Sequence, residues 1–184
     1  MKQNPTDAGT VIWITGLSGA GKTTIARAVY QQILSLHQPC ILLDGDHIRQ
    51  LFGQDLGHSP KDRLVNANRL SRLCHLLSEQ GVDVVCATMS LFKECHRWNR
   101  EHLRNYYEIM IRVPLEILKQ RDARQIYSRA DRGEVSGVAG VDLGFDFPEH
   151  PHLILENSAP TEEFSPLATE ILLSIPKFKH LTVC

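Results

Sequence analysis

One stretch decides the fold, Gly16-Leu17-Ser18-Gly19-Ala20-Gly21-Lys22-Thr23, which matches the pattern G-x-x-x-x-G-K-[ST]. An apolar run at residues 11–14 precedes it and predicts a strand, and an amphipathic helix is expected over residues 22–36. Glycines allow backbone N–H groups to turn toward an anion, and the N-terminus of the following helix carries a partial positive charge. The stretch therefore predicts a cradle for the phosphates of ATP, and a Gly-rich turn without a ligand is the alternative.

Two side chains of this loop carry the expected chemistry. Lys22 is expected to reach the β- and γ-phosphates as a catalytic residue, and the Thr23 hydroxyl is expected to complete the shell of a bound Mg²⁺ ion. The predicted ATP-binding residues of the loop are Gly16, Leu17, Ser18, Gly19, Ala20, Gly21, Lys22, Thr23 and Thr24. The sequence thus implies ATP and Mg²⁺ as ligands of a site for phosphoryl transfer.

The composition narrows the class of protein. With 184 residues the chain is expected to form one compact domain, and 42% hydrophobic residues suffice for a core. The formal net charge of −1 argues against a nucleic-acid partner, because such proteins usually carry a basic excess. The five cysteines are scattered without a C-x-x-C pair, which is typical of reduced thiols in a cytosolic protein. The sequence shows neither a signal peptide nor a bilayer-spanning run, so the predicted location is cytoplasmic and no membrane partner is expected.

Short apolar runs alternate with longer amphipathic segments along the chain, as a parallel α/β fold requires. The runs that predict strands lie at residues 11–14, 40–43, 82–87, 107–112 and 153–155. The segments that predict helices lie at residues 22–36, 59–80, 93–105, 114–121 and 161–173. The strands are apolar almost throughout, which indicates a sheet covered by helices on both faces.

Two carboxylates follow the second expected strand. Asp44 and Asp46 flank Gly45 and, being two residues apart on an extended chain, point to the same side. They lie at the carboxyl end of a strand beside the phosphate loop, where open α/β sheets bind their ligands. Asp44 is expected to position Mg²⁺ or to accept a proton from the acceptor hydroxyl, and Asp46 to orient the acceptor. The alternative is an acidic turn in which Asp46 caps the next helix.

The motif set as a whole resembles the adenylylsulfate (APS) kinase family of P-loop kinases. The motifs that carry the resemblance are G-L-S-G-x-G-K-T-T at residues 16–24, L-D-G-D-x-x-R at 43–49 and D-R-x-x-N at 62–66. The resemblance implies a three-layer α/β/α P-loop kinase that forms homodimers, with a mostly parallel five-stranded sheet and a mobile lid at about 121–147. The kinase domain would span residues 10–175, between a flexible N-terminus at 1–9 and a C-terminal tail at 176–184. The implied reaction is ATP-dependent phosphorylation of the 3′-hydroxyl of adenylylsulfate, which yields PAPS and ADP.

The resemblance assigns the acceptor side to basic and amide side chains. Those that match the family's acceptor-binding motifs are Arg49, Arg63, Asn66 and Arg69. A helical wheel supports two of them independently, because Arg63 and Asn66 share the inward face of the helix expected at 59–80. Polar groups on an inward face need partners, which a nucleotide in a cleft would supply. A local salt bridge for Arg63 and a satisfied core Asn66 are the alternative.

Two further segments are assigned by the resemblance alone. Ser90 corresponds to the serine of the family's I-S-P-F segment, which makes it a candidate catalytic and acceptor-binding residue. A ligand-positioning role is favoured over a phosphorylated intermediate because direct transfer needs none, and a serine that only ends the strand is the alternative. Arg121, expected to contact ATP, begins a basic segment that continues through Arg124, Arg129 and Arg132 and corresponds to the family's lid. A mobile lid would exclude water from the transferred phosphate, and a solvated charged helix is the alternative.

The sequence departs from the family where the family clamps the acceptor adenine between two phenylalanines. His58 stands at the first of these positions and Val138 at the second. Base–aromatic stacking is worth about 1–3 kcal/mol per base, so the loss of both rings weakens the clamp. Adenylylsulfate is the favoured acceptor on the motif set. The first alternative is cytidine diphosphoramidate, the acceptor of a related group of kinases, because a smaller pyrimidine tolerates the lost rings; a non-catalytic nucleotide-binding switch is the second.

Overall fold

A five-stranded sheet lies at the centre of the computed structural model, which describes residues 8–53, 55–57, 59–90, 92–122, 124–144, 146–159 and 163–180. Its strands are β1 (Thr10–Thr15), β2 (Cys40–Asp44), β3 (Asp83–Ala87), β4 (Asn105–Arg112) and β5 (Leu153–Glu156). They lie in the order β2-β3-β1-β4-β5, and each neighbouring pair is parallel. All five strands lie where the apolar runs predicted them, and the described sheet is parallel throughout.

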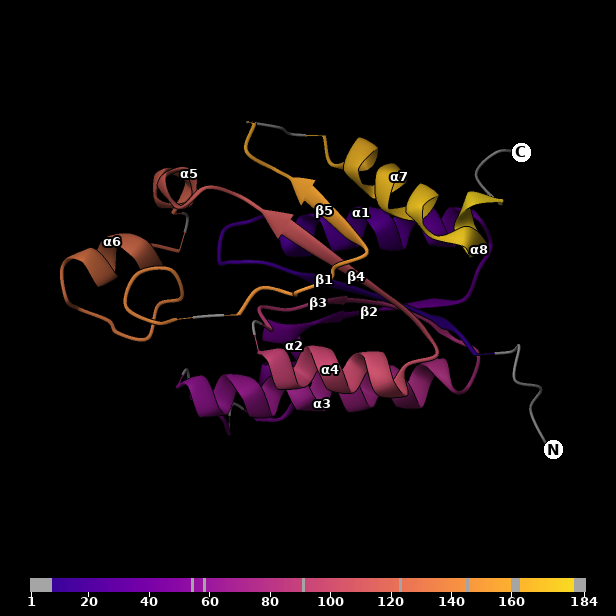
Figure 1. Cartoon of the computed structure of the whole chain (residues 1–184), viewed down its shortest axis with the longest axis horizontal. Coiled ribbons are helices and arrows are strands. Elements are labelled where there is room, and N and C mark those ends of the chain that lie inside the picture. The colour runs from indigo at the N-terminus through magenta and orange to yellow at the C-terminus, as the bar shows by residue number, and fades with distance from the viewer. Residues whose placement is uncertain are drawn as a thin grey trace.

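Helices cover both faces of the sheet (Figure 1). One face carries α1 (Lys22–Ser35), α7 (Ser165–Ser174) and α8 (Pro176–Lys179), and the other carries α2 (Gly45–Leu51), α3 (Pro60–Ser78) and α4 (Lys93–His102). Two short helices, α5 (Leu115–Arg121) and α6 (Ile126–Asp131), follow β4 and lie beyond the carboxyl ends of the strands. The predicted three-layer α/β/α fold is confirmed.

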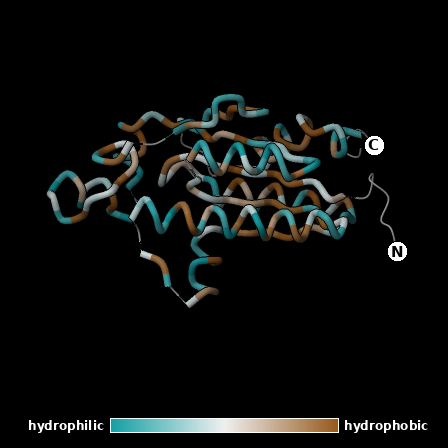
Figure 2. The backbone as a smooth tube through the Cα atoms, turned by 60° about the horizontal axis from the view of Figure 1, so that its bottom comes forward, coloured by the Kyte–Doolittle hydropathy of each residue, from teal (hydrophilic) through white to brown (hydrophobic). Residues whose placement is uncertain are grey.

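The core forms because β1 is apolar on both faces. Ile12 and Ile14 pack with α1 and α7, whereas Val11 and Trp13 pack with α3 and α4. All four side chains are buried, as expected for a central strand between two helical layers. Figure 2 shows the helices alternating between hydrophilic and hydrophobic residues, which is the pattern of amphipathic helices that pack on a sheet. No helix in the described part of the chain is long and apolar enough to cross a membrane.

The C-terminal region is part of this core. The sequence predicted a tail from residue 176, but the chain there forms α8, whose Phe178 is fully buried with α1 and α7. Of the N-terminus predicted to be flexible, only residues 8 and 9 are described, and the Gly9 N–H donates to the Ser78 carbonyl at 2.8 Å.

Lys177 in α8 fastens the C-terminal region to the amino end of the sheet. Its Nζ lies 2.7 Å from both carboxylate oxygens of Asp83, the first residue of β3. Asp83 is 1% exposed and also accepts a hydrogen bond from the Thr10 N–H at 2.7 Å. A buried carboxylate without a cation is costly, so the pair stabilises the packing of α8 against β1 and β3.

We expect Lys177→Met to lower the free energy of unfolding by about 2 kcal/mol. Removing one partner of a fully buried pair costs ~3–5 kcal/mol, and the effect here is smaller because the Lys177 side chain is 38% exposed. Urea denaturation followed by circular dichroism would measure the change. The double variant Lys177→Met/Asp83→Asn should recover part of the loss, since asparagine leaves no uncompensated charge. A single variant as stable as the wild type would show that water alone satisfies Asp83.

Candidate active site

The phosphate-binding loop between β1 and α1 is held in shape by close packing. A Cβ atom added to Gly16 would lie 2.5 Å from the Ile111 carbonyl oxygen, so no larger residue fits there. Gly21 has a φ of +90°, which disfavours any side chain, and an added Cβ would lie 2.6 Å from Asn157 Nδ2. The same Asn157 nitrogen donates to the Ala20 carbonyl at 2.9 Å. These contacts restrict the backbone of the loop at its first residue, Gly16, and before Lys22.

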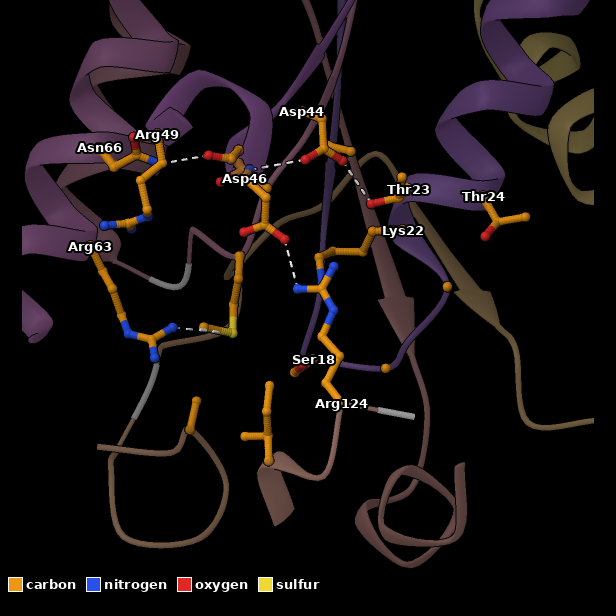
Figure 3. A pocket seen from close by; sticks show the side chains of 18 of the residues that line it. Ser18, Lys22, Thr23, Thr24, Asp44, Asp46, Arg49, Arg63, Asn66 and Arg124 are labelled. Atoms are coloured by element: carbon orange, nitrogen blue, oxygen red, sulfur yellow. Dashed lines mark hydrogen bonds and ion pairs between the residues drawn. The ribbon is translucent and has the colours of Figure 1, made fainter. Parts of the chain in front are cut away.

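The loop forms one wall of a cavity of about 280 Å³ (Figure 3). The predicted site residues that line it are Ser18, Gly19, Gly21, Lys22, Thr23, Thr24, Asp44, Asp46, Arg49, Arg63, Asn66 and Val138. Arg124 of the predicted lid segment also lines it, and the lining residues that the sequence reasoning did not assign are Gly45, Ala87, Thr88, Met89, Ile126 and Ala139. The topology therefore brings the loop, the acid pair and the acceptor-side helix together, as the rule for carboxyl ends of strands predicts.

The Lys22 ammonium group is enclosed by the loop although the residue as a whole is only partly buried. Its Nζ donates to the Leu17 carbonyl at 2.7 Å. Burial lowers the pKa of Lys22 to about 8. The positive charge of Arg124 also lowers this pKa, whereas the negative charges of Asp46 and Asp44 raise it. The group is therefore mainly charged at neutral pH, in a place where a phosphate can replace the carbonyl as its partner.

This pKa predicts how ATP binding depends on pH. The phosphates favour the charged lysine, so binding raises the pKa of Lys22 above its free value of about 8. Below that pH the lysine is charged before and after binding, whereas above it binding must take up a proton and Kd rises by up to about tenfold per pH unit. Titration calorimetry in buffers with different heats of ionisation would measure proton uptake on the alkaline side. Heats that are independent of the buffer there would contradict the assignment.

Thr23 and Asp44 place two oxygen atoms side by side at the loop. Thr23 Oγ1 donates to Asp44 Oδ2 at 2.7 Å (Figure 3). Asp44 Oδ1 accepts from the N–H groups of Asp46 at 2.9 Å and His47 at 3.4 Å, so Asp44 is the N-cap of α2. The alternative in which Asp46 caps this helix is therefore wrong. Mg²⁺ prefers oxygen ligands and is usually held by one or two protein groups together with substrate phosphates, so this pair suits it.

Arg124 reaches across the cavity to Asp46 (Figure 3). Its Nη1 lies 2.6 Å from Asp46 Oδ2, and both side chains are exposed. An exposed pair of this kind is worth about 0–1 kcal/mol, so a phosphate can replace Asp46 as the partner of the guanidinium at little cost. The sequence placed Arg124 in the basic segment but gave no indication of this partner.

Two guanidinium groups lie on the acceptor side of the acid pair (Figure 3). Arg49 Nη1 donates to the carbonyl of Leu56 at 3.1 Å and also to that of Gly57. Arg63 Nη1 lies 4.0 Å from the sulfur of Met89. Burial, together with the nearby charge of Arg49, lowers the pKa of Arg63. Two like charges that face one cavity favour an anionic ligand between them.

Asn66 offers an acceptor atom to the same space. Its Nδ2 donates to the Gly45 carbonyl at 3.2 Å, which fixes the side chain beside the acid pair. Its Oδ1 is buried and has no hydrogen-bond partner within the described residues. A buried polar atom left unpaired costs about 1–3 kcal/mol, so a donor group of a ligand is expected at this atom. The alternative of a satisfied core asparagine accounts for only half of its hydrogen-bonding groups.

Three predicted residues of the loop and two predicted arginines, Arg69 and Arg121, do not line the cavity. Leu17 and Ala20 are buried beneath the loop, and Gly16 is packed against β4. Arg69 forms an ion pair with Asp55, with Nη1 2.8 Å from Oδ1. Their direct contact with a substrate stays a prediction.

The three remaining predicted residues are Arg121, Ser90 and His58. Arg121 donates to the carbonyls of Ser158 at 3.2 Å and Ala159 at 3.1 Å, at the carboxyl side of β5. Ser90 is fully buried and does not line the cavity, and its carbonyl accepts from Thr15 Oγ1 at 3.1 Å. His58 lies outside the described residues.

The segment predicted as a lid contains α6, and this helix is attached to the phosphate loop. The Tyr127 hydroxyl donates to the Ser18 carbonyl at 2.8 Å, and the tyrosine is buried. Asp122 accepts from the N–H groups of Tyr127 at 3.1 Å and Ser128 at 2.8 Å, which fixes the start of the helix. The lid segment thus shares a contact with the ATP side of the cavity, and its mobility stays a prediction.

Apolar side chains form part of the cavity wall, which we call the aliphatic wall. Val138 and Ala139 are 6% and 7% exposed, and Met89 and Ile126 join them in lining the space. Among the described residues that line the cavity, none carries an aromatic ring. This wall can pack against a base but cannot stack with it.

Comparison with known proteins agrees with this geometry. Residues 8–156 match a family model described as adenylylsulphate kinase. A cytidine diphosphoramidate kinase from Campylobacter jejuni is 39% identical over 158 residues, which cover 86% of this chain and 89% of the relative. An adenylyl-sulfate kinase from Paraburkholderia xenovorans is 38% identical over 149 residues, which cover 80% of this chain and 83% of the relative. The structure of the Mycobacterium tuberculosis APS kinase CysC in complex with AMPPNP and APS has a TM-score of 0.83 and 30% identity, and covers 91% of this chain and 97% of its own.

Proposed function

Because the chain belongs to the adenylylsulfate kinase family, we propose that it transfers the γ-phosphoryl group of ATP to the 3′-hydroxyl of adenylylsulfate. The proposal rests on one observation, the convergence of two different sets of side chains in one cavity. Lys22 and the Thr23–Asp44 pair suit the phosphates of ATP, whereas the second set suits an anionic nucleotide. That second set consists of Arg49, Arg63 and Asn66.

In the proposed reaction the loop holds the donor and the acid pair faces the acceptor. Backbone N–H groups and Lys22 bind the β- and γ-phosphates, and Thr23 and Asp44 are the residues that would hold Mg²⁺. When bound, this ion neutralises charge that develops on the phosphate oxygens. The acceptor oxygen bonds to the γ-phosphorus as the bond to the bridging oxygen of ADP breaks. The hydroxyl proton passes to Asp44 in the form of this reaction in which Thr23 alone holds the ion, and Asp46 orients the acceptor.

The position of Ser90 supports direct transfer. A phosphoserine intermediate would require its hydroxyl to reach the γ-phosphate, but the residue is fully buried and does not line the cavity. In-line transfer from ATP to the acceptor needs no such step. We therefore propose that Ser90 helps to position the acceptor and is not phosphorylated.

An assay of product formation tests the function. Purified protein with ATP, Mg²⁺ and adenylylsulfate should form ADP and PAPS in equal amounts, and omission of the acceptor should leave only slow hydrolysis of ATP. A protein that binds ATP while no nucleotide raises its turnover would instead be the non-catalytic switch.

The aliphatic wall favours a second candidate acceptor, cytidine diphosphoramidate. An adenine held without an aromatic partner loses the free energy of stacking, about 1–3 kcal/mol per base. A pyrimidine is smaller and tolerates the lost rings better. The 39% identical relative bears the name of a kinase for this compound. The decisive measurement is kcat/KM for both nucleotides in one assay, because adenylylsulfate as the true acceptor must exceed the other by a wide margin.

We expect the double variant His58→Phe/Val138→Phe to shift specificity toward adenylylsulfate. Restoring the two rings should raise the ratio of kcat/KM for adenylylsulfate over cytidine diphosphoramidate by about tenfold, in line with the strength of base stacking. Val138→Leu is the matched control, because it adds volume without a ring and should leave the ratio near that of the wild type. An unchanged ratio in the double variant would rule out the wall as the source of selectivity.

A further inference from the structure

Two residues of the aliphatic wall come from a segment whose described part forms neither a helix nor a strand. Val138 and Ala139 lie between α6 and β5, where the described residues form only an isolated bridge between Ala139 and Leu143. Both wall residues are nevertheless buried and line the cavity. Regular secondary structure does not fix their position, so other contacts must do so.

Asp142 makes the contacts that fix this wall. Its Oδ2 accepts from the Gly137 N–H at 2.7 Å and its Oδ1 from the Val138 N–H at 2.6 Å. The Val138 carbonyl in turn accepts from the N–H groups of Val141 at 3.0 Å, Asp142 at 3.2 Å and Leu143 at 3.1 Å. The backbone on both sides of Val138 is therefore bonded to a single short turn. Gly137 has a φ of +74°, which lets the chain enter this turn.

The carboxylate of Asp142 is the only side chain among these bonds. The Gly137 and Val138 N–H groups lower its pKa, so it is ionised at neutral pH. Hydrogen bonds to an ionised oxygen are shorter and about twice as strong as neutral ones. Asp142 itself is exposed and contributes nothing to the hydrophobic core, so its removal is expected to release the wall without unfolding the chain.

We propose that Asp142 is a positioning residue for the acceptor, whose carboxylate holds the Val138–Ala139 wall against the cavity. The inference rests on the proposed function, in which this wall faces the acceptor base. Asp142 does not line the cavity, so it acts through the wall and not on the substrate. Loss of the carboxylate should therefore affect the acceptor and leave ATP unaffected.

The first test follows the wall itself in the free protein. Amide hydrogen exchange at Gly137 and Val138 should be about tenfold faster in Asp142→Ala than in the wild type, because local protection reports the hydrogen bond that is lost. Asp142→Asn keeps one acceptor oxygen and should give an intermediate rate. Asp131→Ala is the control, since this exposed acid of α6 pairs with Lys119 at 2.8 Å and does not line the cavity.

The second test measures steady-state kinetics of the same variants. Asp142→Ala should raise KM for the acceptor by about tenfold, with kcat and KM for ATP unchanged, as expected when only ground-state binding is lost. Asp142→Asn should recover part of the change. Wild-type exchange rates at both amides in Asp142→Ala, or an equal loss in the kinetics of ATP and acceptor, would overturn the proposal. If the wild type phosphorylates neither nucleotide, the proposed function fails, and the exchange rates still decide whether Asp142 holds the wall.

Discussion

Replacing Lys22 with alanine is expected to reduce kcat by about 10²–10³-fold, the usual cost of removing a preorganised donor from a site where charge develops. Lys22 is the cation of the phosphate loop, and in the proposed complex the enclosure of its ammonium group would strengthen its interaction with the phosphates. The same enclosure means that folding disfavours its charge, as the pKa of about 8 shows. The variant should therefore be at least as stable as the wild type, which thermal unfolding would measure.

Lys22→Arg is the matched control for charge. A guanidinium keeps the positive charge but has a planar, branched shape that does not fit a site shaped for a single ammonium group. Its kcat should lie between those of the wild type and Lys22→Ala. A folded Lys22→Ala variant with normal turnover would remove this residue from the mechanism.

Asp44→Asn is expected to cause the second large loss, again about 10²-fold or more in kcat, because in the proposed reaction a charged group beside the reacting atoms becomes neutral. The substitution separates two roles of one side chain. Asparagine is as good an N-cap as aspartate, so the bonds to the N–H groups of Asp46 and His47 can persist and α2 should remain stable. Activity should fall while the urea midpoint stays within the range of a surface substitution.

Asp46→Asn is the matched comparison for Asp44→Asn, because it neutralises the other carboxylate of the acid pair. Asp46 is exposed and pairs with Arg124. Because the proposal gives Asp46 the role of orienting the acceptor, the loss of its charge should raise KM for the acceptor more than it lowers kcat. If Asp44→Asn turned over normally, or if both variants showed the same kinetic change, the proposed division of labour within the acid pair would be wrong.

The sheet and the phosphate loop could be predicted from the sequence because their signals are local. Each strand is an apolar run that stands out from its neighbours, and the loop motif needs only the residues at 16–23. The meeting of Lys22, Asp44 and Asn66 in one cavity also followed, because parallel strands place their carboxyl ends at one edge. What the sequence predicted well is what the backbone topology enforces.

Contacts between distant segments could not be predicted. Nothing near Arg124 indicates that it meets Asp46, which lies 78 residues earlier in the chain. Helices α6, with 6 residues, and α8, with 4, are too short for a hydrophobic period, and tertiary contacts hold them instead, through Tyr127 in α6 and through Lys177 and Phe178 in α8. The capping role of Asp44 was missed for a related reason, because both acids suit a cap and only the backbone shows which of them occupies it.

Asn157 ties the shape of the phosphate loop to a segment that is synthesised much later. Its side chain holds the Ala20 carbonyl across 137 residues of sequence and follows β5, the last strand and an edge of the sheet. Proteins fold as they emerge from their N-terminal end, so the loop is made early but lacks this partner until β5 has paired. A nascent chain that ends before β5 carries the whole motif without the contact that shapes it. Since a ligand stabilises the state that binds it, ATP is expected to stabilise nascent chains that include Asn157 more than shorter ones.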